Sequence, residues 1–365
     1  MNIGILLILI LTAIATSVLG VYLVLRKMSM MIDAISHTVL LGIVLAFMVI
    51  GNLSSPLLII GAAFMGVVTV FLTELIVKSK QTSEDSAIGL VFPLLFSIAV
   101  IIISTSFHGV HLDIDSVLLG KIEFAPFDKL FVSGVSIGPK LLYMMLAVTV
   151  INLVFVKVFF KELKLVSFDS ALATTLGFSP IILHYSLMTL VSLTSVAAFN
   201  AVGSILVVAL MIGPASSAIL ITKDLKKTLL IAPIFGIINS VLGYVLAIVV
   251  DVNISGMIAT VTLVTFLLLL IFEPKKGILT SIFRVMRQKD DFSFIILAMH
   301  LNNHDDLKEI DYNNIQNELN WSESKYKKQV DKGIKLGYFK VEKSCVYLTN
   351  IGLQFVSLKT NELQI

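Results

Sequence analysis

The stretch Ile3-Gly-Ile-Leu-Leu-Ile-Leu-Ile-Leu-Thr-Ala-Ile-Ala-Thr-Ser-Val-Leu-Gly-Val-Tyr-Leu-Val-Leu25 carries no charged side chain from its first residue to its last. A helix of about 20 apolar residues is long enough to cross the hydrocarbon core of a bilayer, which is about 30 Å thick. The stretch is too long for the apolar core of a signal peptide, and no basic segment precedes it. We therefore expect it to be retained as a membrane-spanning helix.

Much of the remaining chain is also strongly apolar. Of its 365 residues, 57% are hydrophobic and 14% are charged, whereas soluble proteins carry about 25% charged residues. The mean hydropathy of +0.98 excludes an ordinary cytosolic enzyme. Because lipid cannot pair backbone polar groups, the apolar runs are expected to be helices, which makes the protein an all-α polytopic membrane protein. The nine candidate spans are residues 3–25, 32–51, 55–77, 88–106, 138–160, 181–199, 203–221, 228–250 and 254–272.

The basic residues predict the orientation of these spans. They gather after alternate candidates, and basic loops of membrane proteins lie on the cytoplasmic side. Nine spans then place the N-terminus outside, residues 107–136 outside with a short interfacial helix at Ser116 to Gly120, and the tail in the cytoplasm. The candidates 181–199 and 203–221 are separated only by Asn200 to Val202, so eight spans with an internal N-terminus are the alternative. The basic clusters are Arg26 with Lys27, Lys78 with Lys80, Lys157 to Lys164, Lys223 to Lys227, and Lys275 with Lys276.

The composition changes abruptly after Pro274. The predicted domains are a transmembrane domain over 1–277, a linker over 278–289 and a small module over 290–365. In the module we expect helices at 292–303 and 323–336 with Asn313 to Leu319 between them, then a β-hairpin within Gly337 to Thr349 that turns at Lys343 and Ser344. This order indicates a small α+β winged-helix-like domain. The single cysteine, Cys345, fits a reducing compartment.

Two ionisable residues lie inside the second candidate span. Asp33 and His37 are one helical turn apart, so both side chains leave the same face of the helix. A carboxylate at the centre of a membrane helix costs about 2.5–3.5 kcal/mol on insertion scales, so such groups commonly mark an ion path or a paired site. The alternative is that Asp33 caps the helix or contacts Arg26 and that His37 is a packed polar residue.

One helix offers only two metal ligands here, whereas a bound divalent ion takes four or more. A second, similar subunit facing this one across a pseudo-two-fold axis would complete a site of two oxygens and two nitrogens. Carboxylate and imidazole ligands without thiolate suit Mn, Zn or Fe(II). The neighbouring Met28, Met30 and Met31 leave Cu(I) as an alternative, although methionine is a common apolar filler.

Three further histidines are candidates for a metal path. His108 and His111, close to Asp113 and Asp115, lie in the segment expected outside, where they form either a capture site or an ordinary solvated loop. His184 is near the start of the sixth candidate span. It either lines the path or is a packed, interfacial histidine.

The sequence contains no G-x-x-x-x-G-K-[ST] phosphate loop, so this chain cannot hydrolyse a nucleotide by that chemistry. If ATP drives its activity, the motor is a separate polypeptide. The segment Val166 to Pro180 is typical of a short amphipathic helix that ends at Gly177. It is either a surface that docks on such a motor or an ordinary connecting helix.

Several stretches together resemble the integral-membrane subunits of ABC transporters for manganese, zinc and iron, over about residues 5 to 277. The first stretch is the most specific, and the order of all five makes an accidental match implausible. They are Arg26-Lys-Met-Ser-Met-Met-Ile-Asp-Ala-Ile-Ser-His-Thr-Val-Leu-Leu-Gly42, Asp85-Ser-Ala-Ile-Gly-Leu90, Phe168-Asp-Ser-Ala-Leu-Ala-Thr-Thr-Leu-Gly177, Val202-Gly-Ser-Ile-Leu-Val-Val-Ala-Leu-Met-Ile-Gly-Pro214 and Pro274-Lys-Lys-Gly277.

The resemblance implies a permease subunit of an ATP-driven importer in the bacterial cytoplasmic membrane, not an enzyme, with no covalently bound cofactor. Asp33 and His37 would be the metal ligands. Phe168 to Gly177 would be the coupling helix seated on a cytoplasmic ATPase dimer that binds ATP, with Asp169, Ala173 and Gly177 matching its pattern. The other implied partners are a second permease, identical or related, an extracytoplasmic metal-binding protein and membrane lipid. Such permeases are often described with eight spans.

The tail resembles winged-helix modules attached to some of these permeases. Residues 285–365 hold 11 basic and 11 acidic side chains, which leaves no excess positive charge for nucleic acid. Regulation or docking is therefore preferred to DNA binding, and His300, His304, Asp305 and Asp306 are either metal sensors or polar residues at helix ends. Two other functions stay open: a membrane-anchored metal-responsive regulator, and an ion-coupled secondary carrier in which Asp33 and His37 titrate.

Overall fold

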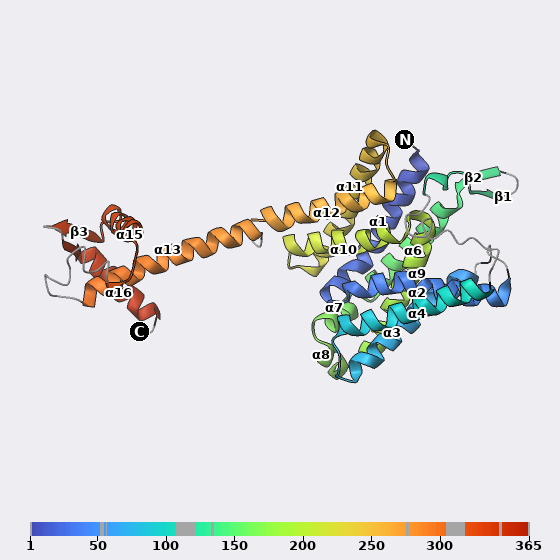
Figure 1. Ribbon diagram of the computed structural model, residues 1–365, viewed down its shortest axis with the longest axis horizontal. Helices are drawn as coiled ribbons and strands as arrows, with labels where there is room; N and C mark the ends of the chain where they lie inside the picture. The colour runs from blue at the N-terminus through green and yellow to red at the C-terminus, as the bar shows by residue number, and fades with distance from the viewer. Residues whose placement is uncertain are drawn as a thin grey trace. The chain divides into compact units, whose positions relative to one another are not determined.

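The computed structural model describes the chain except residues 1, 52–54, 56, 107–121, 133–134, 275–276, 304–317, 343–344 and 364–365. The chain divides into two compact units, Met1–Glu273 and Pro274–Ile365. We call them the membrane unit and the C-terminal unit and describe each by itself (Figure 1). The division falls close to the change of composition at Pro274.

Helices dominate the membrane unit. Nine helices in the described part of the chain are long and apolar enough to cross a membrane, which confirms the predicted all-α polytopic class. They are α1 (Ile3–Leu25), α2 (Ser29–Ile50), α3 (Leu57–Lys78), α4 (Glu84–Ser106), α6 (Lys140–Val158), α9 (Pro180–Val202), α10 (Ser204–Ile221), α11 (Leu225–Val250) and α12 (Ile254–Phe272).

Helix α1 is the centre of one group of helices. It packs against α6, α10 and α11, and α10, α11 and α12 also pack on one another. The helix is buried almost continuously from Thr12 to Leu23. Close approach to α10 depends on Gly20, because a Cβ atom added there would overlap the carbonyl oxygen of Met211. Small residues at such crossings let membrane helices approach closely.

Gly20→Ala is therefore expected to destabilise the membrane unit by on the order of 2 kcal/mol, since α1 and α10 would have to separate around one extra methyl group. A lower thermal unfolding midpoint of the purified protein in detergent would show this. Gly89→Ala in α4 is the matched control, because a Cβ atom there meets no heavy atom within 4 Å. Equal midpoints for the two variants would contradict the close approach.

A second group of helices consists of α2, α3 and α4, with α9 packed on α2 and α3. In Figure 1 the three helices α2, α3 and α4 run side by side. Leu41, Met65 and Leu95 form the apolar contact between them. Thr69 of α3 donates a hydrogen bond to Thr38 of α2 at 2.7 Å. This pairing satisfies a buried hydroxyl and fixes the rotation of α2.

The pair of spans left open by the sequence is two helices, joined at Gly203. This residue has φ +81° and ψ 164°, a conformation that glycine adopts readily and other residues avoid. The hydroxyl of Ser255 at the start of α12 donates a hydrogen bond at 2.7 Å to the carbonyl of Val202 at the end of α9. A helix-terminal carbonyl is thereby paired inside the protein, as a low-dielectric surrounding requires.

A small antiparallel hairpin lies between α4 and α6, and the sequence analysis did not predict it. It consists of β1 (Lys129–Val132) and β2 (Val135–Pro139), preceded by the 3-10 turn η1 (Ile122–Phe124). The interfacial helix predicted at Ser116 to Gly120 lies outside the described residues.

The C-terminal unit contains α13 (Ile278–Asn303), α15 (Glu323–Lys335), β3 (Phe339–Glu342), β4 (Cys345–Leu348) and α16 (Asn350–Leu363). The strands pair in antiparallel fashion at the predicted position, whereas α16 was not predicted. Residues 278–289, expected to be a linker, form the first part of α13, and most of the segment Asn313 to Leu319 lies outside the described residues. The core of this unit includes Phe294, Leu297, Tyr326, Phe339 and Val346.

Asp290 of α13 forms hydrogen bonds with three side chains of α15. Its carboxylate accepts hydrogen bonds from Lys328 at 2.8 Å, Gln329 at 2.8 Å and Lys332 at 3.1 Å. These contacts, the one from Lys328 first, lower the pKa of Asp290 to about 2. Because the folded pKa lies below the unfolded one, the stabilisation is complete above about pH 4–5 and is lost as the pH falls toward 2.

Asp290→Asn is expected to lower the free energy of unfolding of the C-terminal unit by on the order of 1–2 kcal/mol at pH 7. The difference from the unsubstituted protein should shrink between pH 5 and about pH 2. Trp321 is the only tryptophan of the chain and lies in this unit, so its fluorescence in the full-length protein follows the unfolding. A difference that stays constant down to pH 2 would contradict the ion-pair assignment.

Candidate metal site

Asp33 and His37 lie on one face of α2 and contact each other. The distance from His37 Nε2 to Asp33 Oδ1 is 3.6 Å, as the spacing of one helical turn predicts. The side chains are 51% exposed for Asp33 and 32% exposed for His37. A carboxylate and an imidazole that are both open on one face of an apolar helix can bind a common cation.

Helix α4 positions the imidazole. The ring of His37 stacks on Phe92, with centroids 5.6 Å apart and planes 28° apart, and it meets the edge of Phe96 at 5.8 Å. The two phenylalanine rings restrict the imidazole while Asp33 Oδ1 lies on its nitrogen side. The packing therefore orients one ligand and leaves the other partly open.

The alternative roles of Asp33 are not what the structure shows. The N-cap of α2 is Met28, and no side chain caps the helix there. Arg26 is directed elsewhere, since its Nε donates a hydrogen bond to Ser167 at 3.0 Å. The methionines proposed for copper do not form one ligand set, because Met28 and Met31 are buried and line an internal cavity whereas Met30 is 55% exposed.

As a metal site the pair would be incomplete. In the part of the chain that the structure describes, no group of three or more His, Cys, Asp and Glu side chains could hold a metal ion. Asp33 and His37 would supply two ligands, whereas a divalent ion takes at least four. The remaining ligands would have to come from another molecule or from solvent.

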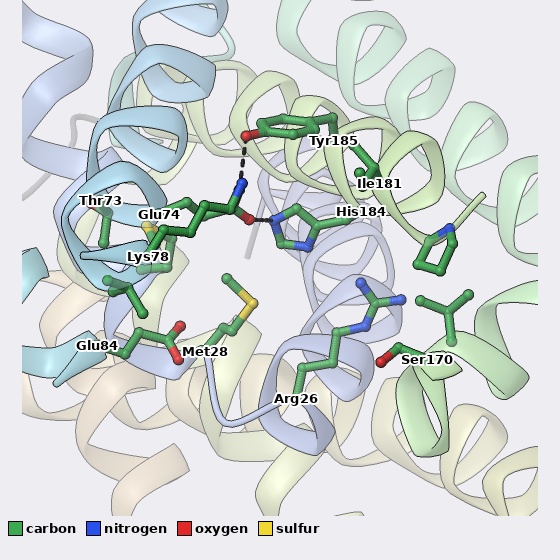
Figure 2. Close-up of a pocket in the computed structure, with 14 residues that line it drawn as sticks. Arg26, Met28, Thr73, Glu74, Lys78, Glu84, Ser170, Ile181, His184 and Tyr185 are labelled. Atoms are coloured by element: carbon green, nitrogen blue, oxygen red, sulfur yellow. Dashed lines mark hydrogen bonds and ion pairs between the residues drawn. The ribbon is translucent and has the colours of Figure 1, made fainter. Parts of the chain in front are cut away.

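A second polar cluster lies at the ends of α3 and α9, around Glu74 (Figure 2). His184 Nε2 lies 2.6 Å from Glu74 Oε1, and the Tyr185 hydroxyl donates a hydrogen bond to Glu74 Oε2 at 2.8 Å. Lys78 Nζ is 3.8 Å from the same carboxylate. His184 thus has a carboxylate partner, as expected of a packed histidine. Glu74 was not among the residues predicted from the sequence.

This cluster borders a cavity of about 490 Å³ that is separate from the Asp33–His37 face. Its walls come from four membrane helices and from the segment that follows α6. Thr73, only 1% exposed, has a hydroxyl without a hydrogen-bond partner in the described chain. The lining residues are Arg26, Met28, Met31, Thr73, Glu74, Val77, Lys78, Glu84, Val166, Ser170, Pro180, Ile181, His184 and Tyr185.

The other predicted metal-path residues cannot be placed. His108, His111, Asp113 and Asp115 lie outside the described residues, as do His304, Asp305 and Asp306 of the tail. His300 is described and lies 2.9 Å from Glu318. It belongs to the C-terminal unit and has no part in the candidate site of α2.

The segment Val166 to Pro180, predicted to be one short helix that docks on a motor, contains the end of α7 (Phe160–Phe168) and the separate short helix α8 (Ser170–Thr175). Asp169 is the N-cap of α8 and accepts a hydrogen bond from the amide of Leu172 at 2.9 Å. Gly177 ends the helix with φ +86°, and the amides of Gly177 and Phe178 bond to the carbonyls of Thr174 and Ala173. These are the two bonds of a Schellman motif, in which glycine is favoured.

The two faces of α8 differ. Ala173 is fully buried, whereas Leu172 is 46% exposed and Leu176 is 60% exposed. Phe168, just before the cap, is 63% exposed. Asp169 and Gly177 therefore shape the helix, Ala173 seats it on the membrane unit, and the apolar residues on the outer side are open to a partner.

A bundle of helices long and apolar enough to cross a membrane defines a multi-pass membrane protein. Residues 3–273 match the family described as the ABC 3 transport family. The chain belongs to this family and is one of its permeases.

Two relatives illustrate the similarity. The manganese transport system membrane protein MntD of Bacillus subtilis is 42% identical over 282 residues, which are 77% of this chain and 95% of the relative. The zinc transport system membrane protein TroD of Treponema pallidum is 40% identical over 304 residues, 83% of each chain. A solved structure, PsaBC from Streptococcus pneumoniae in complex with Fab, aligns with a TM-score of 0.62 and 29% identity, covering 75% of this chain and 92% of that one.

Proposed function

We propose that this chain is the permease subunit of an ATP-driven importer that moves a divalent transition metal, Mn, Zn or Fe, across the bacterial cytoplasmic membrane. The observation that carries the proposal is the Asp33–His37 pair, whose two side chains are partly exposed on one face of a membrane helix. Two relatives of the chain are named for manganese and zinc transport. Carboxylate and imidazole donors suit these metals.

The site needs a second permease, identical or related. A copy of α2 facing this one would add one carboxylate and one imidazole, which brings the ligands to the four that a transition metal takes. The exposed positions on the same face of α2 support this arrangement, since Met30 is 55% exposed and Asp33 is 51% exposed. A site shared between two subunits can open when they move apart, which releases the ion.

Energy would come from a separate ATPase dimer that contacts α8. The exposed Leu172 and Leu176 and the buried Ala173 support a helix that transmits force between two proteins. An extracytoplasmic metal-binding protein would deliver the ion. In this proposal the C-terminal unit is a winged-helix-like cytoplasmic domain with a regulatory or docking role.

The permease pair, reconstituted into vesicles with the ATPase dimer and supplied with the extracytoplasmic metal-binding protein, tests the proposal. We expect uptake of radioactive Mn, Zn or Fe(II) that requires ATP and stops when the ATPase is inactivated. Competition among the three ions identifies the preferred one. Uptake driven by a proton or sodium gradient without ATP would refute the proposal and support a secondary carrier.

A further inference from the structure

The first part of α13, Ile278–Lys289, is largely exposed among the described residues. Its residues from 281 to 289 are all exposed. Ile282 is 49% exposed, Phe283 is 67% exposed and Met286 is 62% exposed. Large apolar side chains exposed together along one helix mark an interaction surface.

These side chains form a stripe. Ile278, Ile282 and Met286 follow one another at intervals of four residues, with Leu279 and Phe283 beside them. Residues four apart lie on one face of a helix, so the stripe is continuous. The opposite face carries Ser281, Arg284 and Gln288. The segment is thus an amphipathic helix with a bulky apolar face and a polar face.

The later part of α13 is different. Phe294, Leu297 and Leu301 are buried in the core of the C-terminal unit. That core ends before the exposed stripe begins, so among the described residues of the C-terminal unit the stripe has no apolar partner. A helical stretch of about 12 residues gains little stability by itself in water and is ordinarily held by packing of its apolar face.

The chain connects this stripe closely to the membrane. Helix α12 ends at Phe272 and α13 begins at Ile278. Residues 273–277 can span at most about 18 Å when fully extended. The first turn of α13 must therefore begin within about that distance of the end of the last membrane span, close enough to reach the headgroup region, which is about 5–8 Å thick on each side of the bilayer.

The charges of the segment match an anionic lipid surface. Between Lys275 and Lys289 the sequence contains five basic residues and no acidic one; the basic residues are Lys275, Lys276, Arg284, Arg287 and Lys289. Basic side chains next to the membrane are attracted to anionic headgroups, at about 1 kcal/mol for each residue near the surface. An amphipathic helix with basic residues on its polar side is typical of helices that lie in the membrane interface.

We propose that residues 278–289 form an interfacial helix that binds anionic lipid, with the stripe in the upper acyl chains and the basic side chains at the phosphates. That this helix lies on the cytoplasmic side of the membrane rests on the proposed function, in which the C-terminal unit is cytoplasmic. The binding surface itself rests only on the exposed stripe, the short connection to α12 and the basic residues. Lipid is preferred to a second copy of the chain because only five residues separate α13 from the last membrane span and residues 275–289 contain basic but no acidic side chains.

The test uses full-length protein with Cys345→Ser and one new cysteine, either Met286→Cys in the stripe or Gln288→Cys on the polar face. Both carry a polarity-sensitive dye in vesicles of phosphatidylcholine with phosphatidylglycerol. A lipid-soluble quencher is expected to quench the dye at 286 at least about threefold more than the dye at 288. A water-soluble quencher should show the reverse order.

Two other results would overturn the proposal. Equal quenching from water at both positions means that the stripe stays in solvent. Shielding of position 286 from both quenchers means that protein covers it, either a second copy or another subunit. In vesicles of phosphatidylcholine alone, quenching of the dye at position 286 by the lipid-soluble quencher should fall. An unchanged value would contradict a role for anionic lipid. Metal uptake by the same labelled proteins, measured separately, keeps a failure of the proposed transport function distinct from a failure of lipid binding.

Discussion

Asp33→Asn is expected to reduce metal uptake at least about tenfold at unchanged abundance in the membrane, and His37→Gln should do the same. Each substitution removes one of the two ligands on α2 while keeping the size and hydrogen-bonding capacity of the side chain. The two side chains are 3.6 Å apart on one helical face. Uptake of radioactive Mn and Zn by cells that express the variants measures the effect.

The double variant sharpens this experiment. If both residues bind one ion, as proposed, removal of the second ligand should reduce uptake far less than removal of the first, so the two losses should not multiply. Asp251→Asn is the matched control, since Asp251 is an acidic residue at a helix end with φ +58°, a conformation that asparagine tolerates. Normal uptake in both single variants would remove Asp33 and His37 from the mechanism.

Leu172→Asp together with Leu176→Asp is expected to abolish ATP-driven transport to below about a tenth of the normal rate. The two side chains are exposed on α8, and burying a carboxylate without a partner in an apolar contact costs several kcal/mol. Co-purification of the ATPase with the permease and metal uptake in reconstituted vesicles measure the loss. Metal bound to the purified permease alone should be unchanged.

Thr174→Asp is a suitable control, because Thr174 is also exposed on α8 but lies on another face of the helix. It adds one carboxylate without entering the apolar row of Leu172 and Leu176. Asp169→Ala should have an intermediate effect, since loss of an N-cap costs about 1 kcal/mol and loosens the helix without changing its outer surface. Full transport in the double leucine variant would exclude α8 as the ATPase contact.

The spans could be predicted because lipid imposes a simple rule on the sequence. Long apolar runs bounded by charges must be helices, and the observed bounds of α1 and α12 coincide with the predicted ones, residues 3–25 and 254–272. The hairpin β1–β2 escaped prediction because its first strand, Lys129–Val132, has three consecutive apolar residues and lacks the alternation of apolar and polar positions seen in β3. Helix α16 (Asn350–Leu363) was not predicted because its apolar residues do not recur with a strong helical period.

The candidate site could be predicted only in part. Asp33 and His37 share a helix, so their spacing alone brings them together. The contact between Glu74 and His184 joins α3 to α9 at a separation of 110 positions in the sequence, which local spacing cannot anticipate. Glu74 could have been singled out as an acidic residue inside an apolar run, which is rare enough in a span to need a partner.

Gly203 has a mechanical consequence. Helix α9 packs on α3 of the second group as well as on α1 and α6, whereas α10 packs mainly with α1, α11 and α12. Gly203 is therefore one of the covalent connections between the two groups of helices, together with the turn from α1 to α2. Rotation of one group against the other changes the two torsion angles of a residue that has no side chain to obstruct them. The hydrogen bond from the Ser255 hydroxyl to the Val202 carbonyl lies next to Gly203 and restricts rotation about its backbone torsion angles.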